Sequence, residues 1–314
     1  MSSDWNVICD YSYKFIDTEN KNVSKEEDKV IFYTDGTKYH KDNKLNNLTS
    51  KAWLIFQKSW FILRPKSRKE NVKLHPAKYP EDLVLDFVQF FTKLGDTVLD
   101  PMLGTGSTLV TCAECGRSGI GIELQEKYAE IAKERINNIV SQSKLSFGDG
   151  LETQFKIIRG NSKKILDMEL PQIDYIITSP PYWDMLKEKG FETQKQREDD
   201  GLDVYYSDDD EDVGNIEDYE KFVDELVEIY RAAVDLLKPK GYMTIVVKNI
   251  KKGGTIYPLA WDLARRLNEF IKLKDEKIWC QDDVNLAPYG YKNAWVSNTS
   301  HQYCLNFRKE ESNI

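Results

Sequence analysis

One short stretch, residues 175–183, constrains the fold of this chain more than any other. Its apolar run, Tyr175-Ile176-Ile177, reads as a buried strand, and Pro180-Pro181 end that strand because proline cannot continue a sheet ladder. Ser179, two prolines and two aromatic rings therefore lie at the carboxyl edge of a sheet, where open α/β sheets bind ligands. A planar base with an exocyclic amine could stack there and donate to Ser179 and the Pro180 carbonyl. Alone, the stretch would be better explained as an ordinary strand followed by a Pro-Pro turn.

A second constraint is the order of elements over residues 97–123. A strand at 97–100 runs into the glycine-rich turn 101–106, a helix follows to about residue 116, and a strand at 119–123 ends in Glu123. Glycines let the main chain approach a ligand, and a helix start offers free N–H donors. An acid after the second strand can accept both hydroxyls of a ribose. This order and spacing predict a nucleotide-cofactor site.

Strands and helices alternate along the rest of the chain. We expect further strands at 30–33, 156–159, 173–178, 242–247, 277–281 and 302–307, and helices at 43–61, 80–93, 125–140, 216–237 and 258–271. The helix at 43–61 would carry Trp53, Phe56 and Trp60 on one side. The alternation predicts an α/β fold with a mainly parallel sheet covered on both faces.

Charge is distributed unevenly. The net charge is −8, yet residues 198–220 alone carry twelve acids and no Lys or Arg. Residues 51–78 carry eight Lys or Arg against Glu70, interleaved with aromatic side chains. This basic stripe is equally typical of a phosphate-binding surface and of a solvated face over buried aromatics. The acidic run Asp208–Asp212 is expected to be solvated chain, with mimicry of phosphate or repulsion of nonspecific DNA as the alternative.

The cysteines and the amino-terminal residues bear on the compartment. Five scattered cysteines favour reduced thiols, and neither a signal peptide nor an apolar run long enough for a membrane span is visible. We therefore expect a cytoplasmic protein without membrane association. Cys112 and Cys115 have CxxC spacing but lie within a predicted helix without a second pair, so we expect structural thiols and no metal site.

Four motifs together resemble those of the amino-methylating DNA methyltransferases. Ser179-Pro180-Pro181-Tyr182 is similar to their [D/N/S]-P-P-[Y/F] catalytic motif, and Asp100-Pro101-Met102-Leu103-Gly104-Thr105-Gly106 to their D-P-F-x-G-x-G cofactor loop. His75-Pro76-Ala77-Lys78-Tyr79-Pro80 resembles the family's H-P-A-x-[F/Y]-P helix start, and Glu123 stands at the position of its acid. The resemblance covers about residues 44–185 well.

This resemblance implies a Rossmann-like class I methyltransferase fold with a mostly parallel seven-stranded sheet and a reversed last hairpin. It implies direct methyl transfer from S-adenosylmethionine to a flipped base, with S-adenosylhomocysteine as product and no metal. The catalytic residues would be Ser179, Pro180, Pro181 and Tyr182, with Tyr182 and Trp183 against the base. The cofactor residues would be His75, Ala77, Tyr79, Pro80, Asp100, Pro101, Met102, Gly104, Gly106, Ser107, Thr108, Glu123, Leu124, Asn161, Ser162 and Ser179. Contacts to the DNA backbone are assigned to Lys58, Arg64, Lys66, Arg68 and Lys69.

Two positions differ from the family pattern, and a third distinguishes between the two branches of the family. Ser179 is typical of the cytosine-N4 branch, so we favour N4 of cytosine over N6 of adenine. Met102 replaces the usual Phe and leaves a softer apolar wall. Asn161 replaces an Asp that accepts the adenine amino group of the cofactor, and an amide oxygen can do the same.

We divide the chain into an amino-terminal appendage (1–50), a cofactor and catalytic part (51–183), an acidic insertion (184–215) and the rest of the domain (216–314). Target recognition is expected in 184–215, around 283–300 or in the amino-terminal segment. Double-stranded DNA is the expected partner, and any restriction endonuclease would be a separate polypeptide. An RNA or protein-glutamine methyltransferase, or a catalytically silent DNA-binding subunit, remains an alternative.

Overall fold

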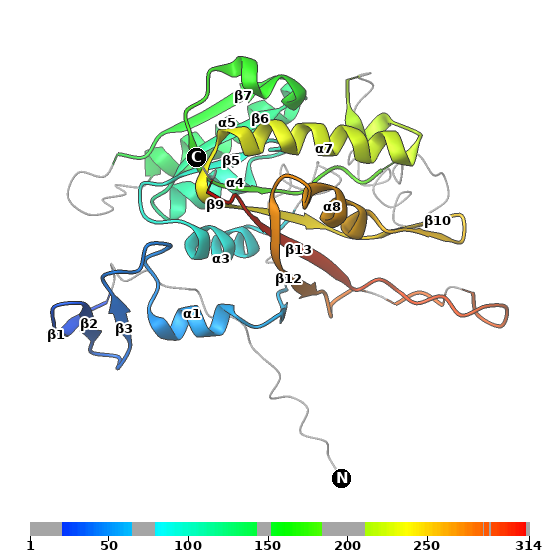
Figure 1. Ribbon diagram of the computed structural model, residues 1–314. Coiled ribbons are helices and arrows are strands. Elements are labelled where there is room, and N and C mark those ends of the chain that lie inside the picture. Colours follow the sequence, from blue (N-terminus) through cyan, green and yellow to red (C-terminus); the bar gives the residue numbers. More distant parts are fainter. Residues whose placement is uncertain are drawn as a thin grey trace, which may run out of the picture.

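The computed structural model describes residues 21–64, 79–142, 152–183, 211–284, 286–288 and 290–311. Its centre is an eight-stranded sheet in the order β4-β12-β13-β9-β8-β5-β6-β7 (Figure 1). Neighbouring strands pair in parallel, except that β13 is antiparallel to both β9 and β12. The strands are β4 (Trp60–Ile62), β5 (Thr97–Asp100), β6 (Ser118–Glu123), β7 (Phe155–Arg159), β8 (Ile173–Thr178), β9 (Leu237–Val247), β12 (Lys272–Cys280) and β13 (His301–Arg308). The predicted mainly parallel α/β sheet with a reversed last hairpin is confirmed, but it has eight strands where seven were predicted, because β4 adds to the edge of β12.

Side chains of the central strands alternate between two hydrophobic cores, one on each face of the sheet. On β8, Ile176 belongs to one core, whereas Tyr175 and Ile177 belong to the other. Figure 1 shows α7 and α3 on opposite sides of β9. The first core is covered by α7 (Tyr219–Leu236) and α8 (Leu259–Leu267), and the second by α1 (Ser50–Phe56) and α3 (Glu81–Phe91). A smaller core lies between α4 (Ser107–Glu114) and α5 (Glu126–Gln142). Because helices cover both faces of the sheet, the carboxyl end of β8 is the place where a ligand can reach it.

The predicted helix over residues 43–61 is too long at both ends, because α1 spans only Ser50–Phe56. Thr49 caps α1 by accepting a hydrogen bond from the Ala52 N–H, but the helix ends at Phe56 and the chain then forms β4. Trp60, Phe61 and Ile62 are aromatic or β-branched residues that favour a strand, and they pair in parallel with the free edge of β12. Trp60 is therefore exposed on a strand and does not share a helix face with Phe56.

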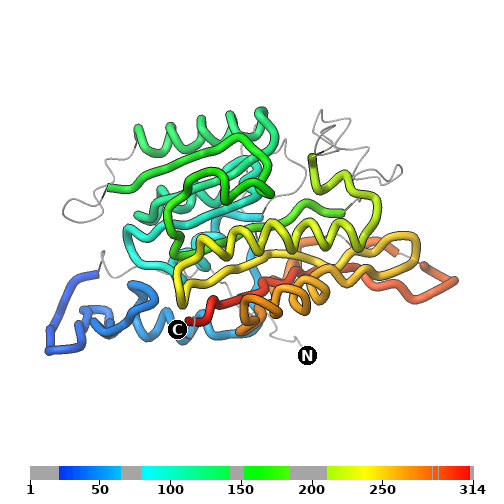
Figure 2. The backbone as a smooth tube through the Cα atoms, turned by 45° about the horizontal axis from the view of Figure 1, so that its top comes forward, coloured from blue at the N-terminus to red at the C-terminus, as the bar shows by residue number. Residues whose placement is uncertain are grey.

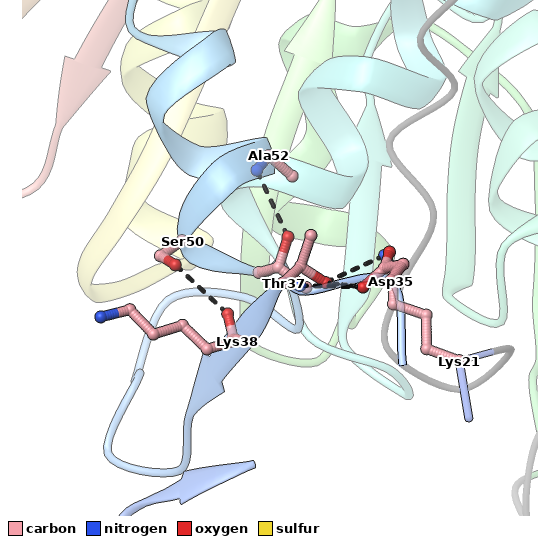
Figure 3. A network of polar contacts seen from close by, with 7 residues as sticks. Lys21, Asp35, Thr37, Lys38, Ser50 and Ala52 are labelled. Carbon is pink, nitrogen blue, oxygen red and sulfur yellow. Dashed lines mark hydrogen bonds and ion pairs between the residues drawn. The ribbon is translucent and has the colours of Figure 1, made fainter. Parts of the chain in front are cut away.

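The described part of the amino-terminal segment forms a small antiparallel sheet of β1 (Val23–Glu26), β2 (Val30–Tyr33) and β3 (Lys38–His40). The turn between β2 and β3 is closed by Asp35, whose Oδ1 accepts from the Thr37 N–H at 2.9 Å and whose carboxylate pairs with Lys21 (Figure 3). Ser50 Oγ donates to the Lys38 carbonyl at 3.3 Å and so ties this sheet to α1. The predicted strand at 30–33 is confirmed.

Two of the remaining expectations concern thiols and membranes. The four cysteines in the described residues are free, and Cys112 and Cys115 are buried at the end of α4. No helix among the described residues is both long and apolar enough to cross a bilayer.

Candidate active site

The strand that carries Ser179 lies at the middle of the sheet. β8 pairs in parallel with β5 on one side and β9 on the other, so β5 and β8 end at the same edge of the sheet, with Thr178 opposite Ile245 of β9. β8 is buried throughout except at Asp174. The two prolines after Ser179 release the chain from the ladder at this edge. The sheet thus presents the Pro-Pro turn next to the end of the strand that precedes the glycine-rich turn.

The glycine-rich turn between β5 and α4 is held from behind by Asp100. Its Oδ1 accepts from the Met102 N–H at 3.0 Å, and its Oδ2 accepts from the Tyr79 hydroxyl at 2.8 Å and from the Thr108 hydroxyl. Complete burial raises the pKa of the Asp100 carboxyl. Asp100 is therefore a support that fixes the turn and Tyr79.

Gly106 begins α4 in a left-handed conformation, with φ +87°. A Cβ at this position would lie 2.8 Å from the Ala132 Cβ of α5 and 3.1 Å from the Ala132 Cα. Both the backbone angle and the close approach of α5 require glycine. The turn is thus closed against α5 and open toward the edge of the sheet.

Glu123 ends β6 and closes the far side of the turn. Its Oε2 accepts from the Gly104 N–H at 2.7 Å and its Oε1 from the Gln125 N–H at 2.8 Å. Burial raises the pKa of Glu123 to about 7, and the nearby charges of Asp212 and Asp100 add to this rise. Each carboxylate oxygen retains acceptor capacity toward a ligand.

A pocket lies between these elements. Its empty volume is about 890 Å³, which includes the solvent at its open end. Ten of the predicted cofactor residues line it: Tyr79, Pro101, Met102, Gly104, Ser107, Glu123, Leu124, Asn161, Ser162 and Ser179. Pro180 and Pro181 line it as well. Four other predicted cofactor residues do not line the pocket: Pro80, Asp100, Gly106 and Thr108. His75 and Ala77 lie outside the described residues.

Sequence reasoning missed part of this lining. The additional residues are Leu103, Thr105, Ile122, Gln125, Tyr128, Gly160, Glu211, Asp212, Val213 and Ile229. Most of them neighbour predicted residues and could have been inferred from the same turns. Glu211, Asp212 and Val213 could not, because sequence spacing does not place a segment that follows a long insertion.

The acidic run ends in the pocket, and for Asp212 the expectation of solvated chain is wrong. Asp212 is 9% exposed, and its Oδ1 accepts from the Gly214 N–H at 2.9 Å to start η4 (Val213–Asn215). Val213 belongs to the first hydrophobic core, the one that α7 and α8 cover. Because Val213 is buried, Glu211, two residues before it, is held at the pocket.

Glu211 forms a polar pair with Asn161. The Asn161 Nδ2 donates to the Glu211 Oε2 at 3.1 Å, while the Asn161 Oδ1 accepts from the Lys163 N–H at 2.9 Å and begins η3 (Ser162–Met168). The hydrogen bond from Asn161 and the charge of Lys164 lower the pKa of Glu211. A side-chain donor and a carboxylate acceptor therefore stand side by side at this end of the pocket.

The aromatic residues that follow the prolines are differently placed. Tyr182 is half-buried, the Lys248 Nζ lies 4.4 Å from the centre of its ring, and burial raises the pKa of its hydroxyl to about 12. Trp183 is 4% exposed and packs against Tyr219 and Tyr257, with ring centroids at 5.2 and 4.6 Å. The structure does not bring Trp183 to the pocket, because this aromatic cluster holds it in the core.

The predicted DNA-backbone residues are only partly described. Arg64 is paired with Asp282, its Nε lying 3.0 Å from Oδ1, and Lys58 is exposed. Lys66, Arg68 and Lys69 lie outside the described residues. Within the described ranges, no three His, Cys, Asp or Glu side chains form a group that could hold a metal ion.

The sequence of the chain matches a known protein family. The N6/N4 methyltransferase family model, described as DNA methylase, matches residues 5–134 and 173–313. The chain is 30% identical over 135 residues to the type II methyltransferase M.MthZI of Methanothermobacter thermautotrophicus, covering 40% of this chain and 38% of that protein. It is 41% identical over 69 residues to the type II methyltransferase M.HpaI of Haemophilus parainfluenzae, covering 22% of each. The matched segments thus span well under half the length of these relatives.

Among solved structures, the chain is similar to NSun6 from Pyrococcus horikoshii, with a TM-score of 0.47, 13% identity and 80% of this chain and 57% of that chain covered. TrmN from Thermus thermophilus gives a TM-score of 0.44 at 17% identity, covering 73% of this chain and 48% of that chain. The strand order itself establishes the Rossmann-like architecture.

Proposed function

Because the chain belongs to the DNA methylase family, we propose that it transfers a methyl group from S-adenosylmethionine to an exocyclic amine of a base in double-stranded DNA. One observation carries the proposal: the predicted catalytic turn and the predicted cofactor turn line the same pocket. Ser179 and Pro180 lie at one part of the lining, and Gly104, Glu123 and Asn161 lie at another. A nucleotide cofactor and a reacting base could therefore meet there.

The polar groups of the pocket fit S-adenosylmethionine. Glu123, Glu211 and Asp212 line the pocket, and no Lys or Arg does so in the described part of the chain, which favours a ligand that carries a sulfonium and an ammonium group. Glu123 would accept from the ribose hydroxyls. Asn161 Nδ2 and the Glu211 carboxylate form a donor and acceptor pair that complements the N1 acceptor and the amine donor of adenine.

When bound, S-adenosylmethionine supplies an electrophilic methyl group on sulfur. The residues of this chain then act on the target amine, whose lone pair is delocalised into the base ring and is a poor nucleophile. Ser179 Oγ and the Pro180 carbonyl would accept the amine hydrogens and favour a tetrahedral nitrogen as the new bond forms, which stabilises the transition state. Pro180 and Pro181 keep these acceptors in place, and Tyr182 would stack on the flipped base.

We favour N4 of cytosine as the acceptor, with N6 of adenine as the alternative, because Ser179 stands in the first position of the motif. The expected partner is double-stranded DNA, with a separate endonuclease as a further open partner. Transfer to RNA or protein would replace the DNA proposal. A protein that does not bind S-adenosylmethionine would be a silent subunit.

The experiment is transfer of tritiated methyl from S-adenosylmethionine to unmethylated plasmid DNA, total RNA and mixed protein in parallel. We expect label in DNA only, with loss of the label in Ser179→Ala. Isothermal titration of both proteins with S-adenosylhomocysteine is the control for an intact cofactor site. Label in RNA or protein, with none in DNA, would overturn the proposed substrate.

A further inference from the structure

Two segments outside the pocket project together from the same end of the molecule. They are the hairpin of β10 (Ile250–Lys252) and β11 (Thr255–Tyr257), and the connection between β12 and β13, of which residues 281–284, 286–288 and 290–300 are described. We name the second segment the distal loop. Figures 1 and 2 both show the hairpin and the distal loop extending beyond the body of the sheet on the same side.

The distal loop has a defined backbone. The Asn298 side chain accepts from the Ala287 N–H at 2.9 Å and donates to the Ala287 carbonyl at 2.8 Å, which holds its two sides together. At its tip, Gly290 has φ +69° and its carbonyl accepts from the Ala294 N–H at 2.8 Å. A Cβ on Gly290 would lie 2.4 Å from the Ala294 oxygen, so this turn requires glycine.

This defined loop exposes large apolar side chains. Trp295 is 90% exposed, Leu286 77% and Tyr291 72%. Single exposed apolar residues are ordinary, but three within ten residues on a turn indicate a surface that binds a partner. The distal loop is thus built to present aromatic rings away from the core.

Contacts connect the distal loop to Trp183, the residue that directly follows the catalytic motif. The Lys251 Nζ of the hairpin donates to the Ser297 carbonyl at 2.5 Å and to its Oγ at 3.0 Å. The next residue, Lys252, places its Nζ 4.7 Å from the centre of the Trp183 ring, and Tyr257 packs on the same ring. A partner held by the distal loop would therefore lie beside the Pro-Pro turn.

The charge of these segments selects the partner. From residue 284 to residue 300 the sole charged side chain is Lys292, and residues 248–257 carry three lysines and no acid. Two acids, Asp282 and Asp283, lie at the base of the distal loop, and Asp282 is paired with Arg64. Beyond that base, the lysines and exposed rings of the two segments fit a polyanion with stacked bases.

We propose that the distal loop and the β10–β11 hairpin are the target-recognition element, and that Trp295 enters the base stack at the target site and fills the space that the flipped base leaves. This inference rests on the proposed function. It assigns target recognition to the segment around residues 283–300, one of the three segments in which we expected it. Lys251, Lys252 and Lys292 contact phosphates beside the target. A stacked side chain stabilises the opened duplex and so favours the flipped state.

The test compares Trp295→Ala with Trp261→Ala, a matched change of a tryptophan that is 56% exposed on α8. Both are assayed against wild type on a duplex that wild type methylates, and on the same duplex with a mismatch opposite the target base. We expect Trp295→Ala to methylate the paired duplex about tenfold more slowly and to recover most of that loss on the mismatched duplex, because the mismatch lowers the cost of flipping. Trp261→Ala should match wild type on both, and all three proteins should bind S-adenosylhomocysteine equally.

Equal rates for wild type and Trp295→Ala on the paired duplex would overturn this inference and leave the proposed function intact. A loss of self-association in Trp295→Ala at unchanged DNA affinity would overturn it in favour of a second copy of the chain as partner. If wild type methylates no DNA at all, the proposed function fails, and this inference fails with it.

Discussion

At the scale of single residues, the pocket depends on two carboxyl groups with different tasks. Asp100 is completely buried and fixes Tyr79, Thr108 and the Met102 N–H from behind the turn. Glu123 is also buried, but it lines the pocket and holds the turn from the ligand side. A carboxyl group therefore supports the turn in one place and, in the function we propose, accepts from the cofactor in the other.

The raised pKa of Glu123 predicts a pH-dependent stability. Its pKa is about 7 in the folded protein against 4.5 for an ordinary glutamate, so the folded state keeps a proton that the unfolded state has lost between these values. The stability that Glu123 contributes is thus fully present below pH 4.5 and is lost as the pH rises through about 7. Glu123→Gln removes this loss, and urea unfolding at pH 5 and pH 8 should show the variant gaining about 2.5 kcal/mol relative to wild type over that range. A constant difference at the two pH values would contradict the assignment.

Ser179 is expected to act in the transition state. Ser179→Ala removes an acceptor for the amine hydrogens and should lower kcat about 100-fold, with an unchanged affinity for S-adenosylhomocysteine. Ser179→Asp, which keeps an acceptor, should retain much more activity. Steady-state kinetics on plasmid DNA measure both. Equal losses in the two variants would assign Ser179 a packing role.

At the scale of elements, short turns determine what reaches the pocket. The turn before α4 is held by glycine geometry, whereas η4 is held by the buried Val213 side chain and by the Asp212 carboxylate that caps it. Each turn therefore gives a variant whose structural and functional effects can be separated.

Gly106→Ala combines two costs, a left-handed backbone and contact with Ala132. We expect it to lower the free energy of unfolding by about 2–4 kcal/mol and to weaken cofactor binding. Gly36→Ala is the control, because its φ is +78° but its Cβ would meet nothing within 4 Å. That variant should lose only about 1 kcal/mol and bind the cofactor normally. Equal losses, measured by urea unfolding, would show that the approach to Ala132 costs nothing.

The segment that follows the acidic run should affect the cofactor rather than DNA. Glu211→Ala removes the acceptor beside Asn161 and should weaken S-adenosylhomocysteine binding roughly tenfold in calorimetry. Glu217→Ala, an exposed acid of the same segment that does not line the pocket, should bind as wild type does. Wild type should also bind S-inosylhomocysteine weakly, because its hypoxanthine ring reverses the donor and acceptor that adenine presents. Equal binding of the two nucleosides would remove Glu211 and Asn161 from adenine recognition.

At the scale of the whole molecule, the order of elements was predictable and the positions of distant segments were not. The strands at 97–100 and 173–178 were predicted residue for residue because turn residues bound their apolar runs. β4 was missed because Trp60 and Phe61 follow a helix at helical spacing, and only pairing with β12 makes them a strand. The pocket residues near each motif followed from the motifs. Glu211 did not, since its place at the pocket depends on packing between segments far apart in the chain.

The most direct test of the central proposal is nucleoside mass spectrometry. Unmethylated plasmid is incubated with the protein and S-adenosylmethionine and then digested to nucleosides. We predict that wild type forms N4-methylcytosine and that Ser179→Ala does not. N6-methyladenine would keep the pocket and the mechanism but overturn the choice of base. The absence of any methylated base, from protein that binds the cofactor, would contradict the proposal that this pocket methylates DNA.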